Sequence, residues 1–210
     1  MRFRNRSEAG HRLADVLARR PIDDAVVLGL PRGGVPVAHE VANALSAPLD
    51  LILVRKIGAP FRPELAMGAI GEEGVRIVNA EVVRQLGVTA TDFAAVEARE
   101  RRELARRALV YRGRRARVSL VGRTALIVDD GIATGSTARA ACQVARALGA
   151  ARVVVATPVA SQGAVDRLRA DADDVVVLDC PETFRAIGEF YDDFSQTTDE
   201  DVMQALGTVT

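Results

Sequence analysis

The sequence of this 210-residue chain is organised around one stretch, residues 125–137, which reads ALIVDDGIATGST. Its first four residues are apolar and indicate a buried strand, and the hydroxyl side chains at its end indicate the start of a helix. Between them lie Asp129, Asp130 and a loop in which Gly131 and Gly135 flank Thr134. Glycines let a loop turn with its N–H groups directed inward, and the unpaired amides of a helix N-terminus favour an anion. The stretch therefore predicts a phosphate-binding loop.

The spacing of this loop excludes the two common nucleotide-binding motifs. A P-loop requires GxxxxGK followed by Ser or Thr, whereas only three residues separate Gly131 from Gly135, and Ser136 stands where the lysine would be. The dinucleotide fingerprint GxGxxG is absent from this strand end and from the others. Two carboxylates beside an anion site require a ligand that also brings hydroxyl donors or a cation such as Mg²⁺. A phosphorylated sugar with a free diol meets this requirement.

Around this stretch, short apolar runs alternate with amphipathic segments, which is typical of βα units in a mainly parallel sheet. The predicted strands cover residues 25–30, 49–54, 124–128, 153–156 and 175–178, and the helices between them cover 7–17, 35–45, 136–148 and 164–170. A small hairpin is predicted over 65–78 and a long polar helix over 91–111. We therefore predict a doubly wound, Rossmann-like α/β fold. We expect residues 1–210 to form one domain, with a flexible insertion at about 92–117 and a C-terminal hood at about 181–210.

The composition narrows the class of protein. With 49% hydrophobic residues, 27% charged residues and no net charge, the chain is neither disordered nor a polybasic nucleic-acid binder. No apolar run reaches the roughly 18 residues of a membrane span, and the basic N-terminus lacks the apolar segment of a signal peptide. Cys142 and Cys180 are 38 residues apart, which favours neither a disulfide framework nor a thiolate zinc site. We expect a cytoplasmic protein with no membrane partner.

Residues 128–137 resemble the signature loop of the type I phosphoribosyltransferases, which binds phosphoribosyl pyrophosphate (PRPP). The resemblance covers residues 25–177, and the run 66–70 is similar to a bacterial branch described only as phosphoribosyltransferase-like. It implies that the two acids hold the ribose hydroxyls and that the following loop encloses the 5′-phosphate. The substrate-binding residues implied in this stretch are Asp129, Asp130, Gly131, Ala133, Thr134, Gly135, Ser136 and Thr137.

Two further loops agree with the resemblance. Pro31-Arg32-Gly33-Gly34 is similar to the pyrophosphate loop of the family, where small residues let backbone amides approach the leaving group. Arg55 and Lys56 resemble the basic loop of adenine-type members, and Lys56 is the only lysine among the 28 basic residues. All three loops follow predicted strands, at the sheet edge where a doubly wound fold binds its ligand.

The activity implied by the resemblance is that of a pentosyltransferase in nucleotide metabolism, in which a nitrogenous base displaces pyrophosphate from C1′ of PRPP. Arg32, Lys56 and Asp130 are the expected catalytic residues, acting by positioning and by stabilising charge on the leaving group. Mg²⁺ is the expected cofactor, held near Asp129 and Asp130 indirectly, through ribose hydroxyls or water. The expected partners are PRPP and a small base, and a homodimer is left open.

Ala133 departs from one branch of the family. In the 6-oxopurine enzymes the matching position is an aspartate that interacts with the purine, and alanine cannot act as an acid or a base. Adenine-like or non-purine acceptors are therefore favoured over hypoxanthine and guanine. Glu64, Glu97 and Glu100 are the remaining candidates for proton transfer.

The arginine-rich segment 97–117 has two interpretations. The part before Ala108 reads as a solvated helix with i,i+4 ion pairs. The part with Arg112, Arg114 and Arg115 falls where the family places a mobile loop that closes over pyrophosphate. A PRPP-sensing regulator or an RNA-binding protein on the same fold is the alternative function, although the neutral chain argues against a nucleic-acid partner. A phosphatase or nucleotide kinase on a related scaffold is a third hypothesis.

Residues 184–194 hold half of the eight aromatic side chains of the chain. They predict a helix packed on the core, with a hood that stacks the acceptor base on Phe190 or Tyr191 as the functional interpretation. His11 and His39 lie on predicted helices without partners at metal-ligand spacing, so we expect surface residues rather than ligands. Cys142 is expected to be buried.

Overall fold

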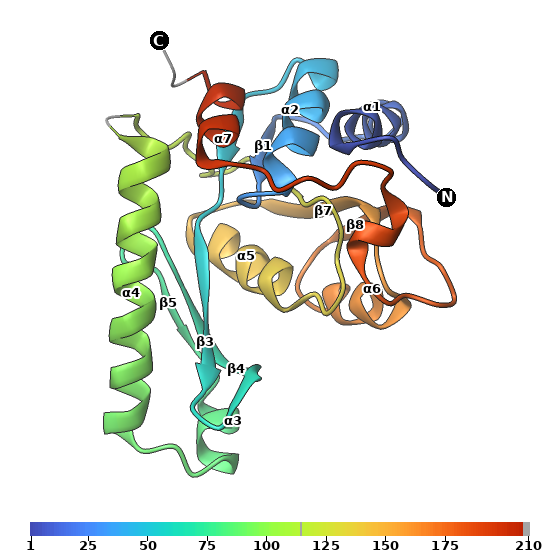
Figure 1. Ribbon diagram of the computed structural model, residues 1–210. Coiled ribbons are helices and arrows are strands. Elements are labelled where there is room, and N and C mark those ends of the chain that lie inside the picture. Colours follow the sequence, from blue (N-terminus) through green and yellow to red (C-terminus); the bar gives the residue numbers. More distant parts are fainter. Residues whose placement is uncertain (114, 208–210) are drawn as a thin grey trace.

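The computed structural model describes residues 1–113 and 115–207, apart from the side chain of Glu64, and centres on a five-stranded parallel sheet in the order β2-β1-β6-β7-β8 (Figure 1). Its strands are β1 Ala25–Gly29, β2 Leu49–Leu51, β6 Thr124–Val128, β7 Arg152–Val159 and β8 Asp174–Asp179. β1 and β6 are buried along their whole length, because helices cover both faces of the sheet. Their apolar runs therefore supply buried side chains to both faces. The predicted α/β fold is confirmed.

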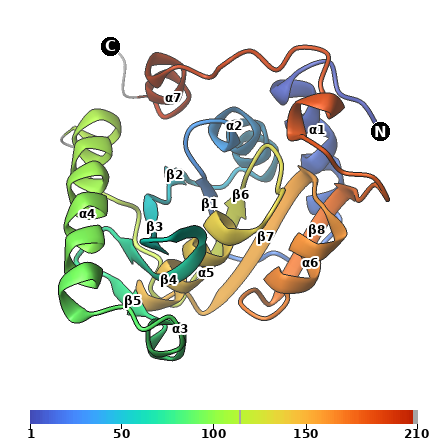
Figure 2. The same ribbon diagram turned by 60° about the horizontal axis from the view of Figure 1, so that its bottom comes forward.

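Two pairs of helices cover the two faces of this sheet (Figure 2). On one face, α1 (Arg6–Leu17) and α2 (Gly34–Leu45) pack through side chains such as Leu13 and Val41. On the other, α5 (Ser136–Ala147) and α6 (Gln162–Leu168) pack through residues such as Val144. Because strand side chains alternate between faces, Leu126 joins the first core and Ile127 joins the second.

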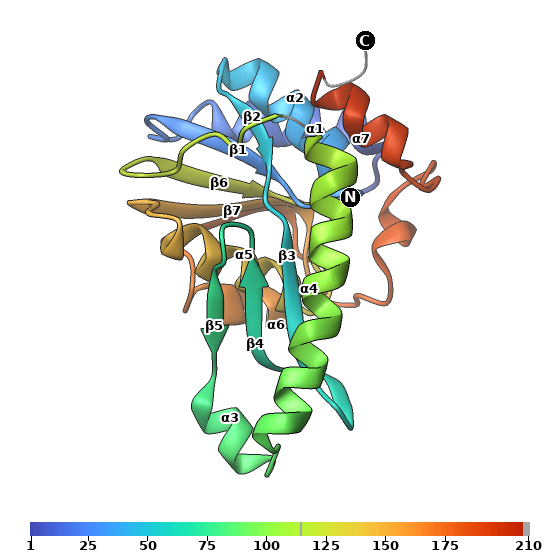
Figure 3. The same ribbon diagram turned by 90° about the vertical axis from the view of Figure 1, so that its left-hand side faces the viewer.

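A separate arm, residues 54–112, extends away from the parallel sheet (Figure 3). It consists of an antiparallel sheet β3-β4-β5 and two helices. Their bounds are β3 Val54–Ala59, β4 Arg62–Gly71, β5 Arg76–Val78, α3 Ala80–Gln85 and α4 Ala90–Arg112. The hairpin and the long helix are where the sequence predicted them. The insertion, however, starts at β3 rather than at residue 92.

The segment 49–54 corrects the prediction of one continuous strand. The chain leaves the parallel sheet after Leu51 and starts a new strand at Val54. Arg55 and Lys56 therefore lie within β3, paired with Ile70 and Ala69 of β4, and not in a loop. Residues 49–54 read LDLILV, and this mainly apolar run carries no signal for such a change of sheet.

The tail is largely irregular, which corrects the helix predicted over 184–194. It contains a short 3₁₀ turn, η1 Ile187–Phe190, and a helix, α7 Asp199–Ala205, that contacts α2 and α4. Aromatic side chains anchor this tail without regular structure: Tyr191 packs on Phe3 and Phe194. Among the described residues, no helix is long and apolar enough to span a bilayer.

Candidate functional site

The site begins where β1 and β6 end side by side. Leu30 N donates to Val128 O at 2.9 Å, which brings the loop after β1 against the acid pair that follows β6. A Cβ atom at Gly33 would lie 2.0 Å from Oδ2 of Asp130, and one at Gly34 would lie 2.5 Å from Val128 O. Both positions require glycine because of these close approaches. The sequence-predicted pyrophosphate loop and acid pair are thus in direct contact.

The two acids have different surroundings. Asp129 is half-buried, and its Oδ1 accepts from the main-chain N–H of Asp130 at 3.0 Å. The buried Asp130 carboxylate accepts from Nε of Arg6 at 2.7 Å, and its main-chain oxygen accepts from the hydroxyl of Tyr191 at 2.6 Å. Burial, and then the adjacent charge of Asp130, raise the pKa of Asp129 well above its ordinary value. Burial also raises the pKa of Asp130, and the Arg6 guanidinium opposes that shift.

Sequence reasoning missed Arg6, which lies 124 residues from Asp130 in the chain. Its segment is basic and carries no motif, so no local signal connects it with the acid pair.

The predicted phosphate loop has the expected local structure. Gly135 adopts φ +76°, a left-handed conformation that favours glycine, and α5 begins at the next residue, Ser136. Two carbonyls of the loop are held from the neighbouring segment: Ala133 O accepts from Ser161 at 2.6 Å, and Thr134 O accepts from Arg167 at 3.2 Å. These bonds hold both carbonyl oxygens on the neighbouring segment.

A cavity of about 580 Å³ lies between the loop after β1, strand β3, helix α4 and the start of α5. Its lining includes one residue from each loop predicted from the sequence: Pro31 of the glycine loop, Lys56 of the basic segment and Thr137 of the phosphate loop. Thr134 and Ser136 instead line a second cavity of about 670 Å³ on the side of α5 that faces β4 and β5. Glu100, a proton-transfer candidate expected from the sequence, belongs to the α4 wall of the first cavity. The rest of that wall was not predicted, because the sequence indicated a solvated helix there.

Two of the proposed proton carriers are counter-ions of arginines. Glu100 is buried and accepts from Arg55 at 2.6 Å and from Arg99 at 3.1 Å. Partial burial raises the pKa of Glu97, but hydrogen bonds from Arg76 and Arg101 outweigh it, so the net pKa shift is downward. Because its pKa is lowered, the Glu97 carboxylate is a poor proton donor. The side chain of Glu64 lies outside the described part of the chain.

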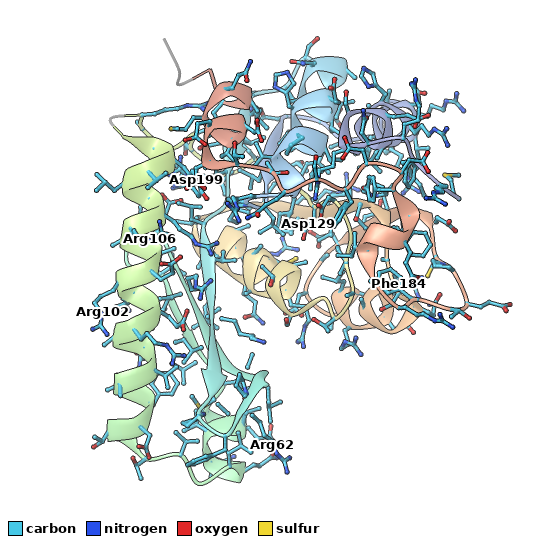
Figure 4. The ribbon with its side chains drawn as sticks, viewed as in Figure 1. Arg62, Arg102, Arg106, Asp129, Phe184 and Asp199 are labelled. Carbon is cyan, nitrogen blue, oxygen red and sulfur yellow. The ribbon has the colours of Figure 1, made fainter. Side chains whose placement is uncertain are left out.

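Arg32 is more than one-third exposed, and its guanidinium points toward Asp199 at 3.8 Å. Asp199 starts α7, beside the end of α4 (Figure 4), and accepts a hydrogen bond from the Tyr111 hydroxyl at 2.7 Å. The arginine predicted for the leaving group is therefore directed toward a carboxylate of the tail.

The base-stacking prediction for Tyr191 is wrong. Tyr191 is 3% exposed and its hydroxyl is bonded to the main-chain oxygen of Asp130, so no base can stack on its ring. Phe190 stacks on Phe184, with ring centroids 5.5 Å apart. The tail instead closes the site at Gly131, where a Cβ atom would lie 2.4 Å from Ile187.

The basic residues predicted for a mobile loop fasten α4 to the body of the protein. Arg112 donates to Asp50 at 2.7 Å and also pairs with Glu72. Arg115 donates to main-chain oxygens of Leu49 and Leu206. Arg114 lies outside the described residues. Arg112 and Arg115 are therefore not available to close over a ligand.

His11 and Cys142 lie as expected: His11 is exposed on α1 and Cys142 is buried in α5, whereas His39 is half-buried and bonded to Ala205 O.

Comparisons with known proteins identify the family of this chain. A family model described as "Phosphoribosyl transferase domain" matches residues 5–195. A Mycobacterium tuberculosis protein named "Putative phosphoribosyl transferase Rv0571c" is 54% identical over 204 residues, 97% of this chain and 46% of that protein. The chain thus spans about half the length of the curated relatives it matches.

Two solved structures show the same fold. TT1426 from Thermus thermophilus is 48% identical, with a TM-score of 0.92 over 98% of both chains. AQ2163 from Aquifex aeolicus is 11% identical, with a TM-score of 0.53 over 98% of this chain and 86% of that one, so it shows similarity of fold alone.

Proposed function

Because the chain belongs to the phosphoribosyl transferase domain family, we propose that it transfers the 5-phosphoribosyl group of PRPP to a nitrogenous base and releases pyrophosphate. The observation that carries this proposal is the meeting of three elements at one sheet edge. The acid pair, the amide-lined turn at Gly135 and the glycine loop after β1 lie together, beside a cavity that contains Lys56. These groups would suit the diol, the phosphate and the pyrophosphate of PRPP.

In the reaction, the base nitrogen forms a bond to C1′ while the bond from C1′ to the pyrophosphate oxygen breaks, and the electron pair leaves with pyrophosphate. The proton of the attacking nitrogen passes to water or to the departing pyrophosphate. The side chains that would stabilise the leaving charge are Lys56, Arg55 and Arg32. Within the site, Arg55 pairs with Glu100 and Arg32 faces Asp199. Holding the sugar and pyrophosphate in one geometry supplies the rest of the rate enhancement.

The residues present fit a Mg²⁺ ion that arrives with the substrate. Mg²⁺ is usually bound by one or two carboxylates plus substrate oxygens, and Asp129 offers a half-buried carboxylate. Asp130 is the poorer ligand, because Arg6 already donates to its Oδ2. No cluster of three or more acidic, His or Cys side chains occurs among the described residues to form a cage. Such an ion would reduce the negative charge on pyrophosphate.

The ion pairs of α4 do not favour the RNA-binding alternative. Arg101, Arg106 and Arg107 pair with glutamates of the same helix. A guanidinium already paired to a carboxylate must give up that partner before it can bind a phosphate, so the segment is a weak nucleic-acid surface.

The decisive experiment incubates the protein with PRPP, Mg²⁺ and a panel of adenine-like, 6-oxopurine and pyrimidine bases, and measures pyrophosphate. We expect release with at least one base, and none when the base is omitted. PRPP binding without release for any base would overturn the transferase proposal and favour a PRPP sensor.

A further inference from the structure

The N-terminal segment, residues 3–6, pairs with residues 190–195 of the tail. Phe3 N donates to Phe190 O and Asp192 N donates to Phe3 O, both at 2.8 Å, and Asp193 N donates to Arg4 O at 2.8 Å. The views agree that the start of the chain lies beside the tail near η1 (Figures 1 and 2). We call these two paired segments the clasp.

The clasp holds Asp130 at both its side chain and its main chain. Arg6 of the first segment donates to Oδ2 of Asp130, and Tyr191 of the second donates to its main-chain oxygen. The side chains of Arg6 and Asp130 are 12% and 10% exposed, so this ion pair is largely shielded from water. Gly33 lies on a further side of the same carboxylate. The orientation of Asp130 is therefore determined by parts of the chain outside its own loop.

Arg6 also connects Asp130 to the rest of the tail. Its Nη1 donates to the main-chain oxygen of Ser195 at 2.7 Å, and its Cζ lies 4.1 Å from the ring centroid of Phe194. A planar guanidinium can make these contacts at once, whereas an ammonium is a single point of charge. One side chain thus ties the acid pair to the segment that covers it.

We propose that Arg6 is a positioning residue for the sugar end of the substrate, which holds the Asp130 carboxylate in its binding orientation and keeps the tail closed over it. The inference rests on the proposed function in one respect, namely that the acid pair binds the ribose hydroxyls. Without Arg6, a buried carboxylate would lose its partner and would turn toward water, away from the diol. The tail would lose two of its contacts in the same change.

The test compares Arg6→Ala and Arg6→Lys with the matched control Arg4→Ala, because Arg4 lies on the same segment but is 80% exposed. Calorimetry gives the PRPP affinity, steady-state kinetics separate KM from kcat, and hydrogen exchange follows the amides of Asp192 and Asp193. For Arg6→Ala we expect PRPP binding weaker by roughly 10- to 100-fold, the effect of one charge-assisted hydrogen bond. KM for PRPP should rise more than kcat falls, and Arg6→Lys should recover part of the affinity. The control should match the wild type.

A role confined to folding would lower the melting temperature of Arg6→Ala and leave the PRPP affinity within twofold of wild type, which would overturn the proposal. If Arg6→Ala does not fold, the affinity of Arg6→Lys decides by the same twofold criterion. If the wild type binds PRPP but turns over no base, the transferase proposal fails while the Arg6 comparison still stands. If the wild type does not bind PRPP, the sugar role of Arg6 is overturned with it. Hydrogen exchange without ligand then tests only the contact of Arg6 with the tail. Protection of residues 192 and 193 in Arg6→Ala equal to that in the wild type would refute this contact.

Discussion

The two adjacent carboxylates of the site are held in different ways. Asp130 is bonded to Arg6 and packed on Gly33, whereas Asp129 is half-buried beside Gly34. Asp129 is the less buried of the two residues and is therefore the better candidate for direct contact with Mg²⁺. At the scale of single residues, two adjacent aspartates of the sequence therefore differ: Asp129 is the less buried acid, and the orientation of Asp130 depends on a distant arginine.

Asp129→Asn should weaken PRPP binding by roughly 10- to 100-fold, because a hydrogen bond to a charged acceptor contributes about 1.5 to 3 kcal/mol. Calorimetry in the presence of Mg²⁺ measures the change. Asp192→Asn, at an exposed position, is the matched control. An affinity equal to that of the wild type would place the sugar elsewhere.

The two cysteines should differ in reactivity. Burial raises the pKa of the Cys142 thiol to about 12, so it is protonated at pH 8, whereas Cys180 is exposed. A thiol reagent at pH 8 should titrate one thiol per native chain and two after unfolding in guanidinium. Two thiols reacting at the same rate in the native protein would contradict the burial of Cys142 in α5.

At the scale of elements, local patterns predicted most of the fold. Residues 125–137 contain their strand, turn and helix start within one continuous stretch, and each was found as predicted. Contacts between distant elements could not be predicted in this way. The bond from Tyr191 to Asp130 spans 61 residues and depends on the path of the tail. The change of sheet after Leu51 likewise depends on the packing of the arm, which the local apolar pattern does not encode.

The attachment of α4 provides a test at this scale. Asp50 is fully buried and accepts from Arg112 and from the main-chain N–H of Val118, both at 2.7 Å. Arg112→Ala leaves this carboxylate without its cation, which should lower the free energy of unfolding by about 3 to 5 kcal/mol. Urea unfolding measures the loss, with the exposed Arg102→Ala on the same helix as control. A loss below about 1 kcal/mol would show that the ion pair does not fasten the helix.

At the scale of the whole molecule, the site is assembled from the parallel sheet, the arm and both segments of the clasp. A ligand that touches all of them should stabilise the folded chain as a unit. At a concentration 100 times its Kd, such a ligand adds about 2.7 kcal/mol. For a chain of this size that raises Tm by roughly 5 to 10 °C.

We therefore expect PRPP with Mg²⁺ to raise Tm by this amount in a thermal melt, and ribose 5-phosphate or pyrophosphate alone to raise it less at the same concentration. The difference arises because each fragment reaches only part of the assembly. Equal shifts for PRPP and either fragment would show that the other half of the site contributes nothing to binding.

The arm also places the only lysine of the sequence on the wall of the 580 Å³ cavity. Lys56 is half-buried there, and every other cationic side chain is an arginine, which amine reagents do not attack. An amine-selective fluorophore can therefore label the cavity wall through the Lys56 side chain, alongside the α-amino group of Met1, which must be blocked or distinguished first.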